Sequence, residues 1–436
     1  MNLVRSPRAI ALAAAATFTV TLAAACFDGG FLVGRVCVDD GDCGPSLQCF
    51  GGVCGDPESS EGVPAEVLWT EVLDSGNQLD DEGLAVATNS AGQAIVAGYV
   101  ARQNAPTDYA LHLFQADGTP ARTTAPYIGE SDLRLRGVTR AQDNGFYAVG
   151  ESTPDTESHV FLVGVDQFGG AVNPTNHTDL DKASGAGIVM LEDGSLTITG
   201  AIEQGMDGLN VLFADYGPGG MPDRDAHLDV GDEKLDDYGH AIALLPDGGL
   251  AVVGTTTQND ATLDLWYGTF DADGDERWIE FHDEDRLDDE AFGVAVDSRG
   301  QLVVAGAVER SGEGQNIWIR KVDADGKRLW TVTHTSVGDH EDVARGVVVD
   351  SEDHAVVVGY VGAGNGEDAD IWTRKLDGDD GSTIWSDVYE GSAGGDDKGF
   401  GVAVDDDDNV FATGSEERDD GNLDVWLRKF AAYRTE

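Results

Sequence analysis

A unit of about 50 residues recurs seven times along this chain, and each copy has one glycine at the end of a short apolar run. The glycines are Gly98, Gly150, Gly200, Gly254, Gly306, Gly359 and Gly414. The intervals between successive glycines are 52, 50, 54, 52, 53 and 55 residues. Periods of this length are typical of propellers and solenoids, whose repeats bury a core only by packing on their neighbours. The repeat covers nearly everything after residue 65.

Every copy has the same internal order of segments, and each segment is typical of β structure. In the fifth copy an acidic loop, RLDDE, precedes GVAVD, a polar turn and LVVAGAV. Then NIWIRKV leads through DADG into RLWTVT. Short apolar runs between Asp-Gly turns predict hairpins. Several runs are apolar on both faces, which requires cover on both sides of the sheet. Radially packed blades supply that cover.

The tryptophans follow the same period and indicate how the array ends. Trp266, Trp318, Trp372 and Trp426 belong to third strands, and Trp278, Trp330 and Trp385 to fourth strands. The eighth, Trp69, lies in VLWTEVL, ahead of the first copy, while the last copy stops after its third strand, DVWLRKF. The N-terminal strand therefore completes the last blade, which removes the exposed edges of an open array. A solenoid would instead need polar caps. The sequence predicts an all-β, closed seven-bladed β-propeller of four-stranded blades over 65–436.

The units resemble the bacterial β-propeller repeats of the SBBP and delta-60 types, which share a D…GVAVD..G..V..G phrase. The resemblance is strongest in copies five to seven and looser in copies two and three, which lack tryptophan. It implies a propeller and leaves function open, because propellers host many activities. The G-x-x-x-W phrases at Gly326–Trp330 and Gly381–Trp385 resemble quinoprotein-type propeller repeats, including those of an outer-membrane assembly lipoprotein.

The N-terminus is typical of an export signal. Arg5 and Arg8 precede an alanine-rich apolar run that ends in LAAAC at Cys26. This resembles the lipobox of bacterial lipoproteins, although Ala23 stands where leucine is usual. The resemblance implies a signal peptide over 1–25, a lipid on Cys26 and a tether over 26–36. An ordinary secreted protein is the alternative. Phe27, which is not aspartate, resembles the pattern of outer-membrane lipoproteins.

Four further cysteines, Cys37, Cys43, Cys49 and Cys54, follow with the spacing C-x5-C-x5-C-x4-C. An exported segment this short needs crosslinks, because it cannot build a core. We expect two disulfides within 37–54, in any of three pairings. Zinc is the alternative, but the spacing lacks the CxxC pairs of zinc sites. The segment resembles the small cysteine-rich modules of surface lipoproteins. Residues 55–64 are expected to form a polar linker.

Charge limits the possible partners. The chain has 81 acidic and 27 basic residues, and its formal net charge is −54. Such a surface repels nucleic acid and anionic lipid headgroups. It suits cations and basic partners, or serves solubility alone.

One acidic residue recurs 17 to 19 positions before each repeat glycine. The seven are Asp81, Asp132, Asp181, Asp237, Asp289, Asp342 and Asp397. We expect them to ring one mouth of the central channel. We favour the interpretation that each aspartate caps its own turn by accepting backbone N–H bonds, because one repeated role explains all seven. The alternative is a site for a cation or a basic partner at that mouth.

The turns at 271–276, 323–327 and 377–381 are acidic enough to suggest calcium loops. None of them has the glycine and distant glutamate of an EF-hand, and Asp-Gly is what a tight hairpin requires. We therefore expect neither a metal nor a cofactor, with calcium as the alternative.

The sequence offers no catalytic motif. It lacks a G-x-S-x-G elbow, a P-loop and an H-E-x-x-H pair. The expected protein is a monomeric, non-enzymatic, lipid-anchored protein of the outer membrane, on its surface or its periplasmic face. Its propeller binds an unknown protein, peptide or glycan and touches membrane only through the lipid. The alternatives are a periplasm-facing scaffold in outer-membrane assembly and a hydrolase or lyase acting at the channel mouth.

Overall fold

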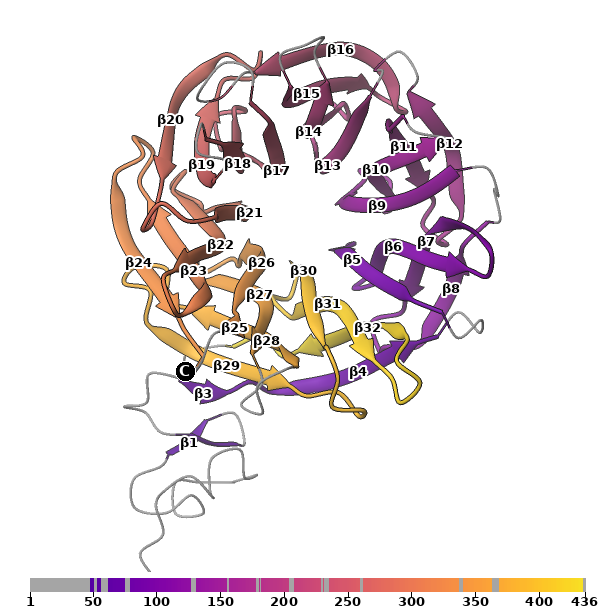
Figure 1. Ribbon diagram of the computed structural model, residues 1–436. Coiled ribbons are helices and arrows are strands. Elements are labelled where there is room, and N and C mark those ends of the chain that lie inside the picture. Colours follow the sequence, from indigo (N-terminus) through magenta and orange to yellow (C-terminus); the bar gives the residue numbers. More distant parts are fainter. Residues whose placement is uncertain are drawn as a thin grey trace, which may run out of the picture.

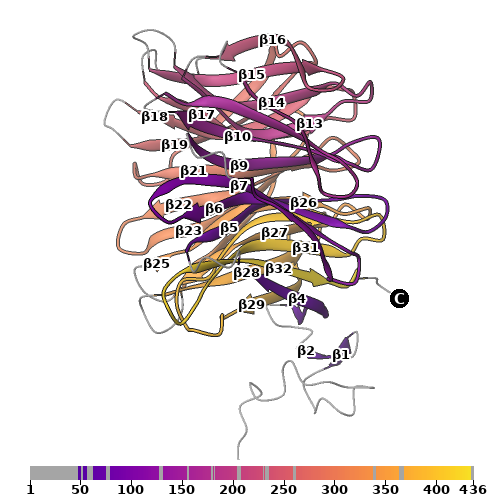
Figure 2. The same cartoon turned by 90° about the vertical axis from the view of Figure 1, so that its right-hand side faces the viewer.

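The computed structural model describes residues 48–50, 53–55 and 62–433, except 75–78, 127–130, 155–156, 178–179, 181, 204–207, 229, 231–234, 259–261, 337–339 and 363–367. Seven antiparallel sheets are arranged radially around one axis (Figure 1), and Figure 2 shows this ring from the side. The predicted closed seven-bladed propeller is confirmed. Within the described residues, no helix has the length and apolar character needed to cross a membrane.

The strands of blades 1 to 3 follow one another in chain order. Blade 1 comprises β5 (Asp81–Thr88), β6 (Ala94–Arg102), β7 (Ala105–Phe114) and β8 (Pro120–Thr124). Blade 2 comprises β9 (Ser131–Arg140), β10 (Phe146–Pro154), β11 (His159–Val165) and β12 (Ala171–His177). Blade 3 comprises β13 (Ala183–Met190), β14 (Leu196–Glu203), β15 (Leu209–Gly217) and β16 (Met221–Leu228).

Blades 4 to 6 repeat this order. Blade 4 comprises β17 (Asp237–Leu244), β18 (Leu250–Thr257), β19 (Leu263–Phe270) and β20 (Glu276–His282). Blade 5 comprises β21 (Asp289–Val296), β22 (Leu302–Arg310), β23 (Gly314–Val322) and β24 (Arg328–His334), with β25 (His340–Glu341) beside β23. Blade 6 comprises β26 (Val343–Val349), β27 (Ala355–Gly362), β28 (Ala369–Leu376) and β29 (Thr383–Tyr389), with β3 (Val63–Pro64) beside β29.

The two ends of the chain close the ring, as the tryptophan pattern predicts. Blade 7 comprises β30 (Lys398–Val404), β31 (Val410–Glu417), β32 (Leu423–Phe430) and the N-terminal strand β4 (Val67–Leu73). Strand β4 runs antiparallel to β32, with Trp69 opposite Lys429. The N–H of Ala431 donates to the carbonyl of Glu66 at 2.9 Å. No blade is therefore left with an unpaired inner or third strand.

The cysteine-rich segment is described only in part. Strands β1 (Gln48–Phe50) and β2 (Val53–Gly55) form a separate two-stranded sheet, in which Cys49 lies opposite Cys54. Cys26, Cys37 and Cys43 lie outside the described residues, as do the predicted signal peptide and tether.

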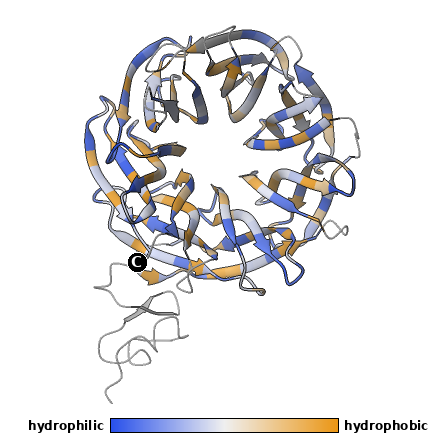
Figure 3. Ribbon diagram, viewed as in Figure 1, coloured by the Kyte–Doolittle hydropathy of each residue, from blue (hydrophilic) through white to orange (hydrophobic). Residues whose placement is uncertain are grey.

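The core lies between blades, which explains the strands that are apolar on both faces. In β22 the first seven residues are all buried, whereas in β24 at the rim only Trp330 is buried. One cluster joins Val303 and Ile319 of blade 5 to Val357 and Trp372 of blade 6. Hydrophobic segments recur along the strands of every blade in Figure 3.

The fourth-strand tryptophans act as wedges between blades. The rings of Trp69, Trp278 and Trp330 each pack on a glycine in the outer hairpin of the following blade: Gly118, Gly326 and Gly381. A Cβ on Gly381 would lie 2.9 Å from the Trp330 ring. The indole N–H of Trp330 also donates to the Gly378 carbonyl at 3.1 Å. The G-x-x-x-W phrase is thus explained, because its glycine receives one wedge and its tryptophan supplies the next.

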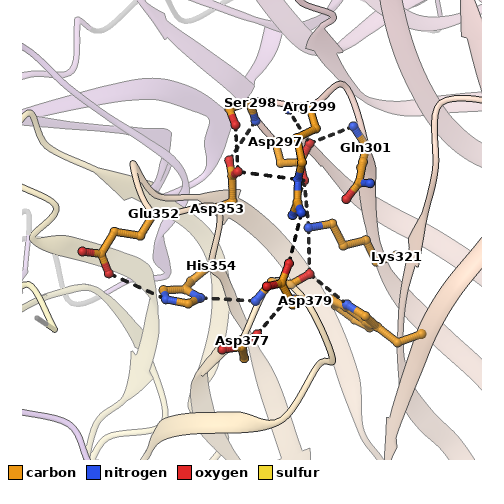
Figure 4. Close-up of polar contacts among 12 residues, drawn as sticks. Asp297, Ser298, Arg299, Gln301, Lys321, Glu352, Asp353, His354, Asp377 and Asp379 are labelled. Carbon is orange, nitrogen blue, oxygen red and sulfur yellow. Dashed lines mark hydrogen bonds and ion pairs between the residues drawn. The ribbon is translucent and has the colours of Figure 1, made fainter. Parts of the chain in front are cut away.

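A buried ion pair recurs in blades 5 to 7 and explains the repeated RK phrase. Lys321 of β23, whose side chain is fully buried, lies 2.8 Å from Asp297, the residue that follows β21 (Figure 4). Its ammonium also donates to the Gly378 carbonyl of the next blade at 2.9 Å. Equivalent pairs join Lys375 to Asp350 at 2.5 Å and Lys429 to Asp405 at 3.1 Å.

Candidate functional site

Every innermost strand contains one β-bulge at the same place. In β5, Gly83 pairs with Gly98 and Ala85 pairs with Ala97, so the intervening Leu84 has no cross-strand partner. The same shift occurs in all seven blades, and each unpaired residue lies 14 positions before its repeat glycine. The seven bulge residues are Leu84, Arg136, Ala186, His240, Phe292, Arg345 and Phe400. A bulge redirects a side chain, and bulges are common beside functional sites.

The bulge also explains the repeat glycines. A Cβ built on Gly98 would lie 1.8 Å from the carbonyl oxygen of Glu82, which no side chain could tolerate. The corresponding distance at the other six glycines is between 1.7 and 2.1 Å. Glycine in a strand often marks such a close approach of two backbones. The glycine that defines the repeat is therefore required by the bulge that shapes the channel.

The bulge residues of all seven blades line one cavity on the propeller axis, with a volume of about 180 Å³. Two guanidinium groups, one imidazole and two phenyl rings are among its lining groups. A cavity lined this way, in a chain with a formal charge of −54, is the natural candidate for a binding site.

Arg345 is the most unusual of these residues. Its guanidinium carbon lies 3.9 Å from the centroid of the Phe292 ring, and one terminal nitrogen donates to the Tyr360 hydroxyl at 3.4 Å. Its Nε is buried and makes no hydrogen bond. No carboxylate of the described residues lies within 4.0 Å of its nitrogens. Both the cation–π contact and the hydroxyl bond hold the guanidinium in place without neutralising it.

His240 lies among the same groups. Its ring is parallel to that of Tyr238, with centroids 6.0 Å apart, and 5.6 Å from the Phe292 centroid. Its Nε2 is 3.1 Å from the Thr255 hydroxyl. Burial, with smaller contributions from Arg345 and Arg136, lowers the pKa of His240 to about 4. The imidazole is therefore neutral above that pH.

Other charged groups surround the mouth. Arg136 pairs with Glu151 at 2.7 Å, and Arg134 lies 4.6 Å from the Tyr99 ring centroid. Burial raises the pKa of Glu290 above its ordinary value, although Arg345 opposes this shift. Burial likewise raises the pKa of Glu82. Burial therefore disfavours the negatively charged form of these carboxyl groups, whereas a guanidinium stays positively charged.

The six repeated aspartates that the structure describes do not line this cavity. Five of them share one position, 17 residues before the repeat glycine, and are almost completely buried: Asp81, Asp237, Asp289, Asp342 and Asp397. Asp342 accepts hydrogen bonds from the N–H of Gly362 at 2.8 Å and from the Ser336 N–H. Asp397 accepts from Glu417 N–H at 2.9 Å and from Gly391 N–H. These carboxylates join the loop before each inner strand to the end of the second strand.

The remaining two aspartates are placed differently. Asp132 is exposed and accepts from the N–H of Thr107 at 2.8 Å, while Leu133 occupies the buried position of its blade. Ala183 occupies that position in blade 3, and Asp181 lies outside the described residues. The spacing of 18 and 19 residues to Gly150 and Gly200, against 17 elsewhere, is the sequence signal of this difference.

The acidic outer turns use their first carboxylate on their own backbone. Asp323 accepts from the N–H groups of Asp325 and Lys327 at 3.1 and 2.9 Å, and Asp271 accepts from Asp273 and Asp275 at 2.9 Å. This is the behaviour of an Asx-turn.

One group of acids that the sequence analysis missed lies at the ring closure. Single carboxylate oxygens of Asp74, Asp81 and Asp424 all lie within 4.8 Å of one another. Burial, with the charge of Asp74 next in importance, raises the pKa of Asp424 to about 6. Nε of Arg418 lies 3.4 Å from Asp424, so a cation is already present beside the cluster.

A second hollow, of about 670 Å³, lies at the rim between blades 2 and 3. Gly164 of β11 pairs there with Val172, at the register where Thr269 of blade 4 pairs with the wedge Trp278. Val172 is 42% exposed and Met221 is 70% exposed. The hollow therefore opens where the tryptophan is missing. No lysine or arginine of the described residues lines it.

Comparisons with known proteins place the fold. No protein-family model matches the sequence, and no curated protein is similar to it. The crystal structure of polysaccharide lyase Uly1 is 12% identical over 86% of this chain and 98% of its own, with a TM-score of 0.51. A protein of unknown function from Dyadobacter fermentans is 11% identical over 84% of this chain and 99% of its own, with a TM-score of 0.48. The X-ray structure of a protein described as a putative gluconolactonase is 14% identical over 68% of this chain and 88% of its own, with a TM-score of 0.38. At these identities the likeness concerns the fold alone.

The bulge residues were missed at the sequence level, although a signal for them was present. They stand at one constant offset from the repeat glycine, but their types differ from blade to blade. The buried aspartates recur as one residue type because they have one structural role, and a repeated residue type is visible in the sequence. The variable position is the one that faces the channel.

Proposed function

We propose that this protein is a binding module whose ligand, a protein, peptide or glycan, engages the mouth of the propeller channel. The observation that carries the proposal is the bulge ring, which gathers Arg136, His240, Phe292, Arg345 and Phe400 around one cavity. Arginine and aromatic residues are enriched where binding energy is concentrated in interfaces. One side chain from each blade allows specificity to vary while the scaffold stays constant.

The test is a binding screen with the purified protein against arrays of glycans and peptides and against envelope extracts. Phe292→Ala should abolish binding of any ligand that enters the channel. Arg328→Gln, which changes an exposed arginine on the outer strand β24, is the matched control and should leave binding unchanged. A ligand that Phe292→Ala retains at full affinity would place recognition elsewhere.

We also propose that the protein acts at the outer membrane, held there by a lipid on Cys26. The support is the LAAAC sequence and the cysteine-rich segment that follows it. Replacing Cys26 with serine should release the protein from the membrane fraction. Protease treatment of intact cells then distinguishes the two faces: digestion supports surface recognition, and protection favours the alternative of a periplasmic assembly scaffold.

A second candidate is a hydrolase or lyase at the same mouth, and His240 is the observation that favours it. Its imidazole lies beside Tyr238 and is neutral above about pH 4, as a proton acceptor must be, although the same low pKa makes it a weak base. The solved lyase with a similar fold is described as acting on polysaccharide. Incubation with a panel of polysaccharides, followed by assay of new chain ends, tests this candidate. Activity lost in His240→Gln would support it.

A further inference from the structure

We propose that the channel mouth receives a single carboxylate on a small apolar body, with the Arg345 guanidinium as its principal donor. The inference rests on the proposed function and deepens it, because it gives the chemical class of the group that the channel recognises. It follows from a half-buried arginine that has no carboxylate of the described residues within 4.0 Å, in a strongly acidic protein.

Arg345 lacks an ion-pair partner among the described residues. The chain has 81 acidic residues, and several arginines pair with them, as Arg428 does with Asp387 at 2.7 Å and Arg299 with Asp379 at 3.0 Å. Arg345 has no carboxylate of the described residues within 4.0 Å, and its buried Nε has no hydrogen-bond partner. A buried donor without an acceptor is destabilising, so retaining one requires an explanation. The guanidinium as a whole therefore lacks a carboxylate partner among the described residues, and an anion in the cavity would supply one.

Two contacts orient the guanidinium group of Arg345. The Phe292 ring lies under the guanidinium at 3.9 Å, and the Tyr360 hydroxyl holds one terminal nitrogen. These contacts fix the plane of the group before any ligand arrives. Arginine binds carboxylate with two parallel N–H bonds from such a plane, and prior orientation reduces the entropy lost on binding.

The charged groups around His240 determine the electrostatic potential in the cavity. Arg136 of blade 2 and Arg345 of blade 6 both act on His240 of blade 4, where their charges add to burial in disfavouring the imidazolium. The two cations therefore influence the same small space on the axis. Arg345 lowers the pKa of Glu290, but burial raises that pKa by more, which disfavours the negative charge on Glu290. Because Arg136 is already paired with Glu151 at 2.7 Å, Arg345 is the principal cation that would attract an incoming negative charge.

The size of the cavity and the net charge of the protein limit the ligand. The cavity has a volume of about 180 Å³ and its lining includes Leu84, Phe292 and Phe400. This is smaller than the roughly 300 Å³ at which drug-sized sites begin, so it suits one functional group with a small apolar body. The net charge of −54 repels a polyanion at long range. A carboxylate carried by an otherwise neutral or basic molecule meets both conditions.

The experiment uses benzoate and its neutral analogue benzamide as probes, titrated calorimetrically into the full-length protein. We expect saturable benzoate binding and an affinity for benzamide that is lower by about tenfold or more, as for loss of a charge-assisted pair. Arg345→Gln should weaken benzoate binding by a similar factor, Arg345→Lys should retain part of it, and Arg328→Gln should change nothing. Because a variant can misfold, the arginine Nε–Hε resonances of the wild-type protein provide a second readout, and benzoate should shift the Arg345 signal.

Equal affinities for benzoate and benzamide, or full benzoate binding by folded Arg345→Gln, would overturn the inference. The two proposals fail separately. If the screen finds a ligand that needs Phe292 and not Arg345, the channel binds and the carboxylate assignment is wrong. If benzoate binds as expected while the screen finds no ligand for the channel, the carboxylate site stands and the proposed function fails.

Discussion

At the scale of single residues, the repeated phrases of this chain are explained by contacts that join two parts of one blade or two neighbouring blades. The lysine of IWIRKV and the aspartate of GVAVD are far apart in sequence, yet Lys321 and Asp297 are both fully buried and 2.8 Å apart. Asp297 also accepts from the N–H groups of Arg299 and Gln301. Removing one member of such a pair leaves the other charge buried and uncompensated.

We therefore expect Asp297→Asn to lower the free energy of unfolding by about 3–5 kcal/mol, because Lys321 loses its counter-ion without regaining water. Asp406→Asn is the control, since Asp406 is 62% exposed in its pair with Arg140. Its effect should not exceed about 1 kcal/mol. Denaturant titration of both variants measures the difference, and equal midpoints would contradict the assignment.

At the scale of elements, the bulge and the glycine form one unit in every blade. The bulge turns one side chain toward the axis and brings the preceding carbonyl against the second strand. Only glycine leaves room for that carbonyl, which lies 2.1 Å from a Cβ built on Gly306. The channel lining can vary because the backbone that presents it is constant.

Gly306→Ala should destabilise blade 5 by about 1–3 kcal/mol or more, because the new methyl group meets the Glu290 backbone. Gly217→Ala, where the nearest atom to a Cβ is 3.8 Å away, should change stability by less than about 0.5 kcal/mol. Denaturant midpoints again provide the test. A tolerated Gly306→Ala would show that the bulge can be rearranged at little cost.

At the scale of the whole molecule, closure depends on one N-terminal strand. Strand β4 covers β32, and Trp69 packs on Phe114 and Phe411 of the two blades it joins. Without β4, the third strand of blade 7 would be an exposed edge. Residues 66 and 431 lie side by side, because the N–H of Ala431 donates to the carbonyl of Glu66.

A circular permutant that begins at residue 75 and carries 62–74 after residue 436, through a short flexible linker, should fold with the native strand order. A shortened protein over 75–436 should aggregate or unfold at a lower temperature. Size-exclusion chromatography and circular dichroism distinguish the two. Equal behaviour of both proteins would mean that β4 is dispensable for closure.

The charge of the whole molecule and its buried acids predict one pH dependence. Burial raises the pKa of Asp289 and Asp397 from 3.8 to about 7. Between pH 3.8 and about 7 these two carboxyl groups stay protonated in the folded protein and ionise in the unfolded chain. Their contribution to the free energy of unfolding is therefore complete below about pH 4 and is lost as the pH rises through about 7. The net charge of −54 acts in the same direction, since repulsion grows as the acids ionise.

Unfolding free energy should therefore fall as the pH rises from 5 to 8. In about 1 M salt, where the Debye length is about 3 Å, the surface contribution is screened and the slope that remains reports the buried acids. Asp397→Asn should reduce that remaining slope. An unchanged slope in this variant would show that Asp397 does not titrate in this range.

Seven blades, their strand order and their closure were predictable from this sequence, because each depends on a local pattern repeated seven times. Hairpin turns, apolar strands and the matched terminal segments all act over a few residues. The common position of Asp289, Asp342 and Asp397 was equally visible, because one structural task selects one residue type.

The lining of the channel was decided only by tertiary structure. Arg136, His240 and Arg345 are about 100 residues apart in sequence and share no motif. They meet because the bulges of all seven blades lie around one axis. The sequence of a single repeat does not show which residues of the other repeats will lie beside it. The lack of a carboxylate beside Arg345 likewise depends on which neighbours its blade brings near. The repeat determined the scaffold, and closure of the ring determined which side chains share a site.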